Sequence, residues 1–241
     1  MNEPVSDIAI QFDDADQQRS AAVLGMWIFL STEVLFFGGM LVAYSVYRHS
    51  YPDEFQAASE QLNLWAGAAM TAVLLAGSLL VAMSDHLHER EHERDARHEH
   101  HAQHGRNAQH ASGDRPRRTI VRYLLITVVL GVAFLGLEFY EYASLFGERL
   151  FPGVNYDNHA FAHLSLEGRS TQLFFVLFFC MTGLHAVHMM IGISLVAGLA
   201  CAMHLTQRPS RLGNPLKVIG LYWHFVDIVW IFLYPLFYLV R

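Results

Sequence analysis

Five long stretches of this chain contain almost no charged residues, and they constrain its fold more than any other feature. They are residues 21–47, 62–83, 123–146, 173–203 and 218–240. Each is long enough to cross a hydrocarbon core of about 30 Å, which takes about 20 helical residues. Only 16% of the 241 residues are charged, whereas soluble domains usually carry about a quarter. The sequence therefore predicts an all-α integral membrane protein with five transmembrane helices.

The segment before the first apolar stretch is acidic. Among residues 1–20, five are Asp or Glu and one is Arg. A secretory signal begins with a basic region and has a shorter apolar core than residues 21–47. We therefore expect this stretch to remain in the protein as a spanning helix. Residues 1–20 are interpreted as an N-terminal segment outside the membrane, and residues 21–241 as one membrane domain.

The basic residues are unevenly divided between the two sides of the predicted membrane domain. Twelve of the sixteen lie in residues 1–20, 84–122 and 204–217, which five spans place on the same side. Lys and Arg are enriched in cytoplasmic loops of membrane proteins. The sequence therefore predicts a cytoplasmic N-terminus and an outside C-terminus.

The loop between the second and third spans, residues 85–118, is rich in histidine. It holds eight of the fifteen histidines, and the tightest cluster is His98, His100 and His101. Clustered imidazoles suit zinc, copper or nickel, so one interpretation is a metal-binding tract. The favoured interpretation is a solvated, weakly structured linker of mixed charge. We expect its beginning, to about Arg94, to extend the second spanning helix.

Four of the five predicted spans carry ionisable side chains, which are costly at bilayer depth and need a partner or a function. They are Glu33, Glu138, Glu141, His185, His188, His224 and Asp227. Six of the seven form pairs spaced three residues apart, which places each pair on one helix face. A metal site, a proton path and a structural polar network are all compatible with this pattern. The network is favoured, with carboxylates accepting hydrogen bonds from imidazole, indole and hydroxyl groups.

The last span carries two tryptophans on the same face as Asp227. Trp223, Asp227 and Trp230 follow one another at i, i+4 and i+7, the spacing of a single helix face. This face either lines a crevice for an acyl chain or contacts protein, and the pattern alone favours neither. Pro235 is expected to bend or loosen the helix near its end.

The motifs on these spans resemble subunit III of the haem–copper respiratory oxidases. The last span reads YWHFVDIVW over residues 222–230, which is similar to the last-helix signature of that family. TGLHAVH at residues 182–188 resembles the preceding helix of the family. Glu33, within STEVLFF, resembles its membrane carboxylate, and the pair Glu141 and Tyr142 resembles its Glu-Tyr pair. The resemblance covers residue 21 to the C-terminus apart from the histidine-rich loop.

The chain departs from the family's longer form in three respects. It lacks the first two of seven helices, as do five-helix subunits of bacterial cytochrome c oxidases and quinol oxidases. Glu138 stands where the family commonly has a non-acidic residue, which suggests one proton shared with Glu141 or an added base. The histidine-rich loop is not part of the family pattern.

The resemblance implies a non-catalytic subunit that binds phospholipid and has no redox cofactor of its own, since haem and copper lie in partner subunits. It implies packing against oxidase subunit I, near subunit II, in a bacterial cytoplasmic membrane, with no role for nucleic acid. Spans 1 and 2 would form one bundle and spans 3 to 5 another, around a lipid cleft. The cleft, or a role in proton uptake and oxygen access, would involve Glu33, Trp223 and Trp230. The internal polar network would comprise Glu138, Glu141, His185, His188, His224 and Asp227.

Two alternative functions remain open from the sequence. A five-helix subunit associated with nitric oxide reductase would show the same spans and motifs. A metal-ion transporter would use the histidine-rich tract to deliver its ion and membrane carboxylates such as Glu33 and Asp227 to carry it across.

Overall fold

The computed structural model describes residues 14–101, 114–157, 161, 168–205 and 213–239. Its helices are α1 (Ala15–Ser50), α2 (Pro52–Ser59), α3 (Leu64–His101), α4 (Asp114–Gly147), α5 (Gly168–Leu205) and α6 (Gly213–Tyr234), followed by a π-helical turn, η4 (Pro235–Leu239). All except α2 and η4 are long and apolar enough to cross a membrane, and η4 continues the span that begins in α6. The predicted all-α membrane fold with five spans is confirmed.

The helix ends follow from short polar side chains and prolines. The Asp14 carboxylate accepts a hydrogen bond from the backbone N–H of Gln17, at 2.6 Å, and so caps the start of α1. Asn63 caps α3 in the same way, because its side-chain oxygen accepts from the backbone N–H groups of Trp65 and Ala66. Pro52 occupies the first turn of α2, where no backbone donor is needed,.

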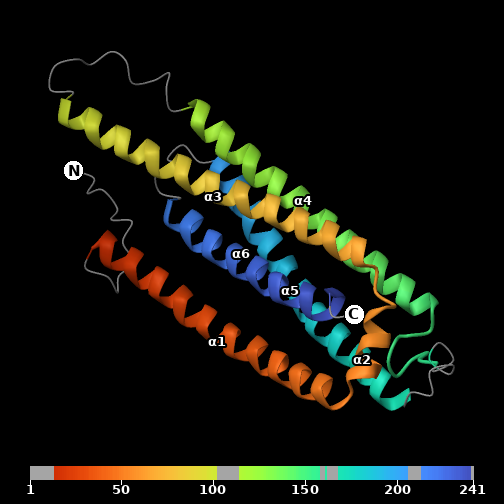
Figure 1. Ribbon diagram of the computed structural model, residues 1–241. Helices are drawn as coiled ribbons and strands as arrows, with labels where there is room; N and C mark the ends of the chain where they lie inside the picture. Colours follow the sequence, from red (N-terminus) through yellow and green to blue (C-terminus); the bar gives the residue numbers. More distant parts are fainter. Residues whose placement is uncertain (1–13, 102–113, 158–160, 162–167, 206–212, 240–241) are drawn as a thin grey trace.

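The helices are grouped differently from the expected two-plus-three arrangement. The second span, α3, packs along α4 and α6, and α5 completes a four-helix bundle with them. The first span, α1, packs instead against α6 and α5, so α6 lies between α1 and α3 (Figure 1). The prediction that the first two spans form their own bundle is therefore wrong.

Small residues on α3 explain why it joins the larger bundle. A Cβ atom at Gly67 would lie 2.7 Å from the Tyr234 ring of α6. One at Gly77 would lie 3.5 Å from Trp223 of α6 and 3.7 Å from Thr127 of α4. The absence of side chains at these positions lets large aromatic residues approach the α3 backbone, as is typical of helix contacts in membranes. The glycines of α1 do not allow a close helix contact of this kind. A Cβ atom at Gly25, Gly38 or Gly39 would have no neighbouring atom within 4 Å.

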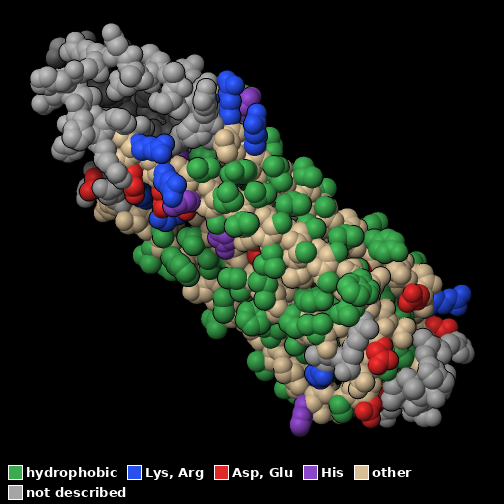
Figure 2. All heavy atoms as spheres, turned by 45° about the horizontal axis from the view of Figure 1, so that its top comes forward, with side chains coloured by type: hydrophobic (Ala, Val, Ile, Leu, Met, Phe, Trp, Pro, Cys, Tyr) green, Lys and Arg blue, Asp and Glu red, His purple; other side chains and the backbone are tan. Residues whose placement is uncertain are grey.

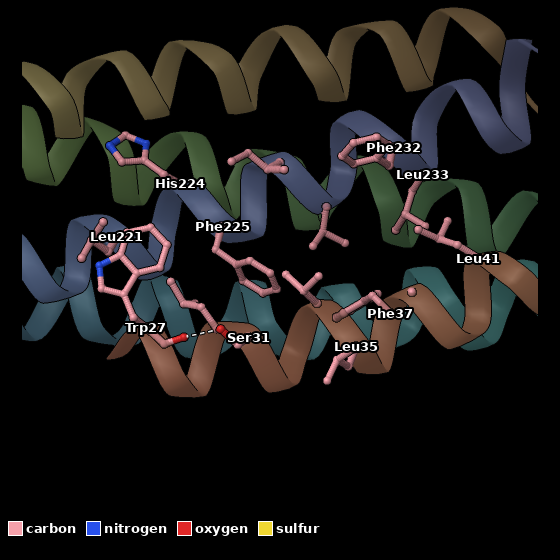
Figure 3. Close-up of a pocket in the computed structure, with 15 residues that line it drawn as sticks. Trp27, Ser31, Leu35, Phe37, Leu41, Leu221, His224, Phe225, Phe232 and Leu233 are labelled. Carbon is pink, nitrogen blue, oxygen red and sulfur yellow. Dashed lines mark hydrogen bonds between the residues drawn. The ribbon is translucent and has the colours of Figure 1, made fainter. Parts of the chain in front are cut away.

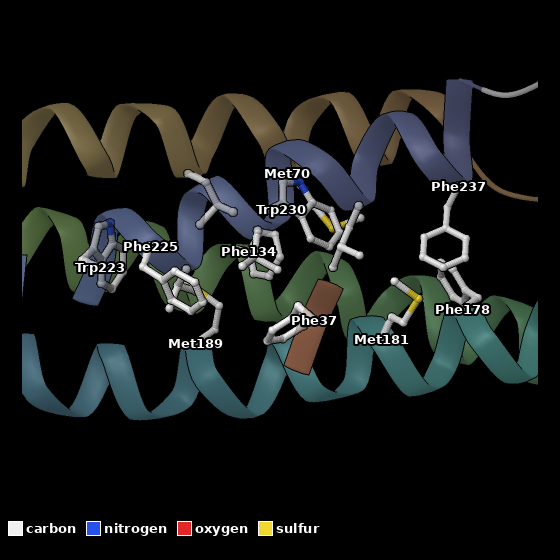
Figure 4. Close-up of a cluster of buried hydrophobic side chains, with 14 of the residues drawn as sticks. Phe37, Met70, Phe134, Phe178, Met181, Met189, Trp223, Phe225, Trp230 and Phe237 are labelled. Atoms are coloured by element: carbon white, nitrogen blue, oxygen red, sulfur yellow. The ribbon is translucent and has the colours of Figure 1, made fainter. Parts of the chain in front are cut away.

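The bundle interior is built from aromatic and methionine side chains contributed by all of the long helices (Figure 4). The Phe134 and Trp230 rings meet edge to face, with centroids 4.8 Å apart. Beyond the C-terminal end of α6, Phe237 of η4 meets Phe178 of α5 in the same way at 5.3 Å. Edge-to-face contacts of this kind add to the stability that burial alone provides.

The chain loosens at Pro235, as expected from the sequence. There α6 gives way to η4, and the carbonyl groups of the turn find partners on other helices. The Tyr44 hydroxyl of α1 donates to the Leu236 carbonyl at 2.7 Å, and the Ser59 hydroxyl of α2 donates to the Phe237 carbonyl at 2.6 Å. These bonds satisfy backbone groups that a regular helix would have paired.

The histidine-rich tract is more helical than expected. The second spanning helix continues past Arg94 to His101, and α4 begins at Asp114. Glu, Arg and Ala, which are frequent in this tract, favour helix,. The expected extension of the second spanning helix to about Arg94 is therefore confirmed, and the weakly structured interpretation is wrong for residues 95–101 and 114–118. The side chains of His98, His100 and His101 lie outside the described part of the structure, so the metal-binding interpretation stays a prediction.

The surface is divided in the way that a membrane requires. Hydrophobic side chains cover the middle of the molecule, and charged side chains gather towards its two ends (Figure 2). This distribution agrees with the five spanning helices.

Candidate functional site

An open apolar groove lies between α1 and α6, with a cavity volume of about 790 Å³ (Figure 3). Its floor contains buried rings such as Phe37 and Phe225, and its walls include side chains as exposed as Leu35, at 76%. The complete lining is Trp27, Leu30, Ser31, Val34, Leu35, Phe37, Gly38, Leu41, Leu221, His224, Phe225, Ile228, Val229, Phe232 and Leu233.

Each of the two side chains Ser31 and His224 already makes a hydrogen bond within the protein. The Ser31 hydroxyl donates to the Trp27 carbonyl on its own helix at 2.8 Å. His224 shares a hydrogen bond between its Nδ1 atom and the Ser78 hydroxyl of α3, at 2.7 Å. The groove therefore offers an occupant mainly hydrocarbon contact, which suits an acyl chain and not a polar ligand.

Trp223 and Trp230 do not line this groove. Each is only 1% exposed and lies inside the four-helix bundle. The Trp230 indole N–H donates to the Thr71 hydroxyl of α3 at 3.1 Å. Of the two interpretations of this helix face, the structure supports protein contact. The α6 residues that do face the groove, such as Phe225 and Phe232, lie on the adjacent face.

Glu33 pairs with His188 across the contact between α1 and α5. Its Oε2 atom lies 3.2 Å from the Nε2 atom of His188, and both side chains are largely buried. The other ring nitrogen of His188, Nδ1, lies 2.8 Å from the Leu184 carbonyl. Phe37, one turn after Glu33, lines the groove and packs edge to face on the His188 ring at 5.5 Å. The pair therefore lies directly beside the groove.

The geometry of this pair fixes how many protons it holds. A carbonyl only accepts hydrogen bonds, so Nδ1 of His188 must carry a proton. The 3.2 Å contact then requires one further proton, either on Glu33 or on Nε2 of His188. In both arrangements the pair as a whole is neutral, which lowers the cost of burying it at bilayer depth.

We expect Glu33→Gln to leave the stability of the protein within about 0.5 kcal/mol of wild type, because an amide retains a hydrogen bond to His188. Glu33→Leu should cost about 1 kcal/mol, since it leaves a buried ring nitrogen without a partner. Thermal unfolding of the purified chain in lipid nanodiscs measures both changes. Equal losses from the two variants would show that the hydrogen bond contributes nothing.

Glu138 and Glu141 belong to two separate hydrogen-bonded groups. The Tyr142 hydroxyl donates to Glu138 at 3.2 Å and lies 2.6 Å from the Thr182 hydroxyl of α5. Glu141 accepts from the Tyr238 hydroxyl of η4 at 2.9 Å and from the backbone N–H of Asn63 at 3.1 Å. Within the described residues no hydrogen bond joins the two carboxyl groups, so the idea that they share one proton gains no support.

His185 and Asp227 are buried without hydrogen bonds to the part of the chain that the structure describes. His185 is fully buried, and its ring lies beside Phe134 and Trp230, at centroid distances of 5.5 and 5.1 Å. Neither of its ring nitrogens has a partner there, and neither carboxylate oxygen of Asp227 has one. Ser78 and Trp223 are polar neighbours of Asp227. Within the described residues these polar side chains lie in several local groups, and the expected polar network as a whole stays a prediction.

The described residues contain no group of three or more His, Cys, Asp or Glu side chains placed to hold a metal ion. Glu33, His185, His188, His224 and Asp227 are among these described residues. The side chains of the histidine cluster at residues 98–101 are not.

The α1 side of the groove was not predicted from the sequence, although a signal for it exists. Residues 27, 31, 34, 38 and 41 recur at alternating steps of four and three, which marks one stripe along a helix,. On α6, residues 221, 225, 228 and 232 repeat the same steps. Matching stripes on the first and last spans indicate two helices that face each other, and the structure brings these two faces together.

Comparison with known proteins shows which family the chain resembles. Residues 150–240, which include α5 and α6, match the family model described as cytochrome c oxidase subunit III. The cytochrome c oxidase subunit 3 of Thermostichus vulcanus is 27% identical over 237 residues, which cover 96% of this chain and 94% of that protein. A probable quinol oxidase subunit 3 of Staphylococcus haemolyticus is 26% identical, with coverage of 90% and 88%. The matches to these relatives therefore extend over all five spans, and the chain is similar to subunit 3 of cytochrome c and quinol oxidases along almost its whole length.

Proposed function

We propose that the chain is a non-catalytic accessory subunit of a respiratory haem–copper terminal oxidase that takes electrons from cytochrome c or quinol. It packs against the catalytic subunit I, near subunit II, and these partners hold the haem and copper. The names of its relatives support this proposal, since both kinds of subunit 3 match along almost the whole chain. The excess of basic residues in the loops on the same side as the N-terminus supports a cytoplasmic N-terminus in a bacterial cytoplasmic membrane,.

The observation that carries the proposal is the apolar groove between α1 and α6. It lies on two helices that span the membrane, and its lining is almost entirely hydrocarbon. Filling the groove with an acyl chain replaces loose lipid contacts with close van der Waals packing. A phospholipid bound there would hold α1 against the bundle at the place where direct contact between the helices is limited. The accessory function is therefore to present a lipid-filled surface that stabilises the oxidase.

The proposal includes support of proton uptake and oxygen access. Glu33 lies beside the groove, and its pair with His188 holds one proton that is able to sit on either partner. Oxygen is a small apolar molecule, so a hydrocarbon-lined groove offers it a more favourable environment than a polar surface does.

Filling the groove tests the lipid part of the proposal. Gly38 lines the groove, and a Cβ atom at this position meets nothing within 4 Å. Gly38→Leu should therefore fold normally, occupy the acyl-chain position and weaken phospholipid binding at least about tenfold, or 1.4 kcal/mol. Native mass spectrometry of the purified chain, titrated with phospholipid, measures the change.

Gly39→Leu is the matched control. Gly39 is equally open but does not line the groove, so this variant adds the same side chain elsewhere on α1. It should bind phospholipid like the wild type. Equal retention of lipid by Gly38→Leu and wild type would rule out the groove as the lipid site.

An affinity-tagged form of the chain tests the oxidase assignment. Extracted from its own cells in a mild detergent, it should bring with it a protein that shows haem absorbance. Haem bound stoichiometrically to the isolated chain would overturn the non-catalytic assignment. A haem-free preparation with no oxidase subunit bound would overturn the assignment of the partner.

A further inference from the structure

A second cavity lies between α4 and α5, at the same end of the bundle as the start of α1. Its volume is about 460 Å³, many times the roughly 30 Å³ that one water molecule occupies,. Its lining is strongly basic and is distinct from that of the apolar groove. The lining residues are Arg117, Arg118, Val121, Arg122, Leu125 and His204.

One of the arginines builds the rim of this cavity. Arg117 donates from Nε to the Met203 carbonyl and from Nη2 to the His204 carbonyl, both at 2.8 Å. These carbonyls belong to the last described turn of α5, and a cation is favourable at the C-terminal end of a helix,. Arg117 therefore fastens α4 to the end of α5, and this contact holds the basic side chains of both helices around one space.

The cavity lies where the apolar part of the bundle begins. The candidate span of α4 starts at Arg117, and that of α5 ends at Leu205. Arg118 and Arg122 are exposed and lie one turn apart, which is a rise of about 6 Å,. Leu125, which follows in the next turn, is also half exposed. Along α4 the lining therefore changes from guanidinium groups to hydrocarbon, in the direction of the membrane interior.

We propose that this cavity binds an anionic phospholipid, with its phosphate between Arg118 and Arg122 and an acyl chain along Val121 and Leu125. A guanidinium group donates paired hydrogen bonds that match the oxygens of a phosphate. Basic pockets between transmembrane helices on the cytoplasmic side are suited to acidic headgroups. A zwitterionic lipid brings its own cation into a space that already holds three arginines, so the cavity should prefer a net negative lipid. This inference does not depend on the oxidase assignment.

Lipid titration of the purified full chain tests the proposal. Native mass spectrometry should show that phosphatidylglycerol binds more tightly than phosphatidylcholine with the same acyl chains. Arg118→Gln and Arg122→Gln should each weaken phosphatidylglycerol binding about fivefold, and the double variant about 25-fold. Arg122→Lys, which keeps the charge, should lose less than Arg122→Gln. Arg117 is left unchanged because it connects the two helices.

Arg90→Gln is the matched control, because Arg90 is exposed on α3 at the same end of the bundle and does not line the cavity. It removes the same charge and should leave lipid binding within about twofold of wild type, since its charge is screened from the site by solvent. An equal effect of Arg90→Gln would mean that general surface charge attracts the lipid. Equal affinity of the wild type for the two lipids would overturn the proposal even if the double variant failed to fold. Displacement of phosphatidylglycerol by inorganic phosphate at equal concentration would assign the site to free phosphate instead.

Discussion

Replacing Trp230 with alanine is expected to lower the free energy of unfolding by about 3 to 5 kcal/mol, because it opens a large cavity at the centre of the four-helix bundle. The Trp230 side chain is 1% exposed and connects three other helices. Its ring contacts Phe134 of α4 and lies 5.1 Å from the His185 ring of α5, and its indole N–H donates to Thr71 of α3. The substitution removes all of these contacts together.

Trp65→Ala is the control for this prediction. Trp65 is on α3 and is 82% exposed, so the same change of side chain should cost well under 1 kcal/mol,. Reversible unfolding of the purified chain in mixed micelles measures both variants. A loss for Trp230→Ala no greater than that for Trp65→Ala would mean that Trp230 is not packed as the structure shows.

The second large effect concerns Gly131, where α4, α5 and α6 meet. A Cβ atom at this position would lie 2.8 Å from Ile193 of α5 and 3.1 Å from the Trp223 ring of α6. Ile193 is able to move by changing rotamer, but the rigid indole ring is buried and has no space to shift. Gly131→Ala should therefore destabilise the protein by about 1 to 3 kcal/mol, the usual cost of overpacking.

Gly136→Ala provides a control on the same helix. A Cβ at Gly136 meets nothing within 4 Å, so alanine should stabilise α4 by up to about 1 kcal/mol through its helix propensity,. The two variants should thus shift the unfolding midpoint in opposite directions in the same assay. A stabilising effect of Gly131→Ala would show that the three helices are further apart than described.

The spans were predictable because they depend on a local property of the sequence. A hydrocarbon core demands about 20 consecutive apolar residues, and each of the five runs meets this demand by itself. The bend at Pro235 was predictable for the same reason, since a proline lacks a backbone N–H wherever it stands. The extension of α3 to His101 was underestimated because its charged residues were weighed by composition and not by helix propensity.

The partners of the helices and of the polar side chains were not predictable in the same way. Tyr238 donates to Glu141 from the π-helical turn that follows α6. The pairing of Glu33 with His188 depends on which face of α1 meets α5. Trp223 was assigned with Trp230 to a possible crevice because spacing shows that residues share a face, but not what lies opposite it. In each case the answer depends on contacts between residues far apart in the chain.

The position of α1 has a consequence for how the protein is made. This helix is synthesised first, yet the helices that it packs against, α5 and α6, are synthesised last. The end of α1 and the start of α6 are separated by about 160 residues, which take on the order of ten seconds or more to translate,. During this interval Glu33 lacks its partner His188, which belongs to the later helix α5. Of the five spans, α1 is therefore synthesised first but packs against its partner helices last, after the C-terminal half of the chain has been made.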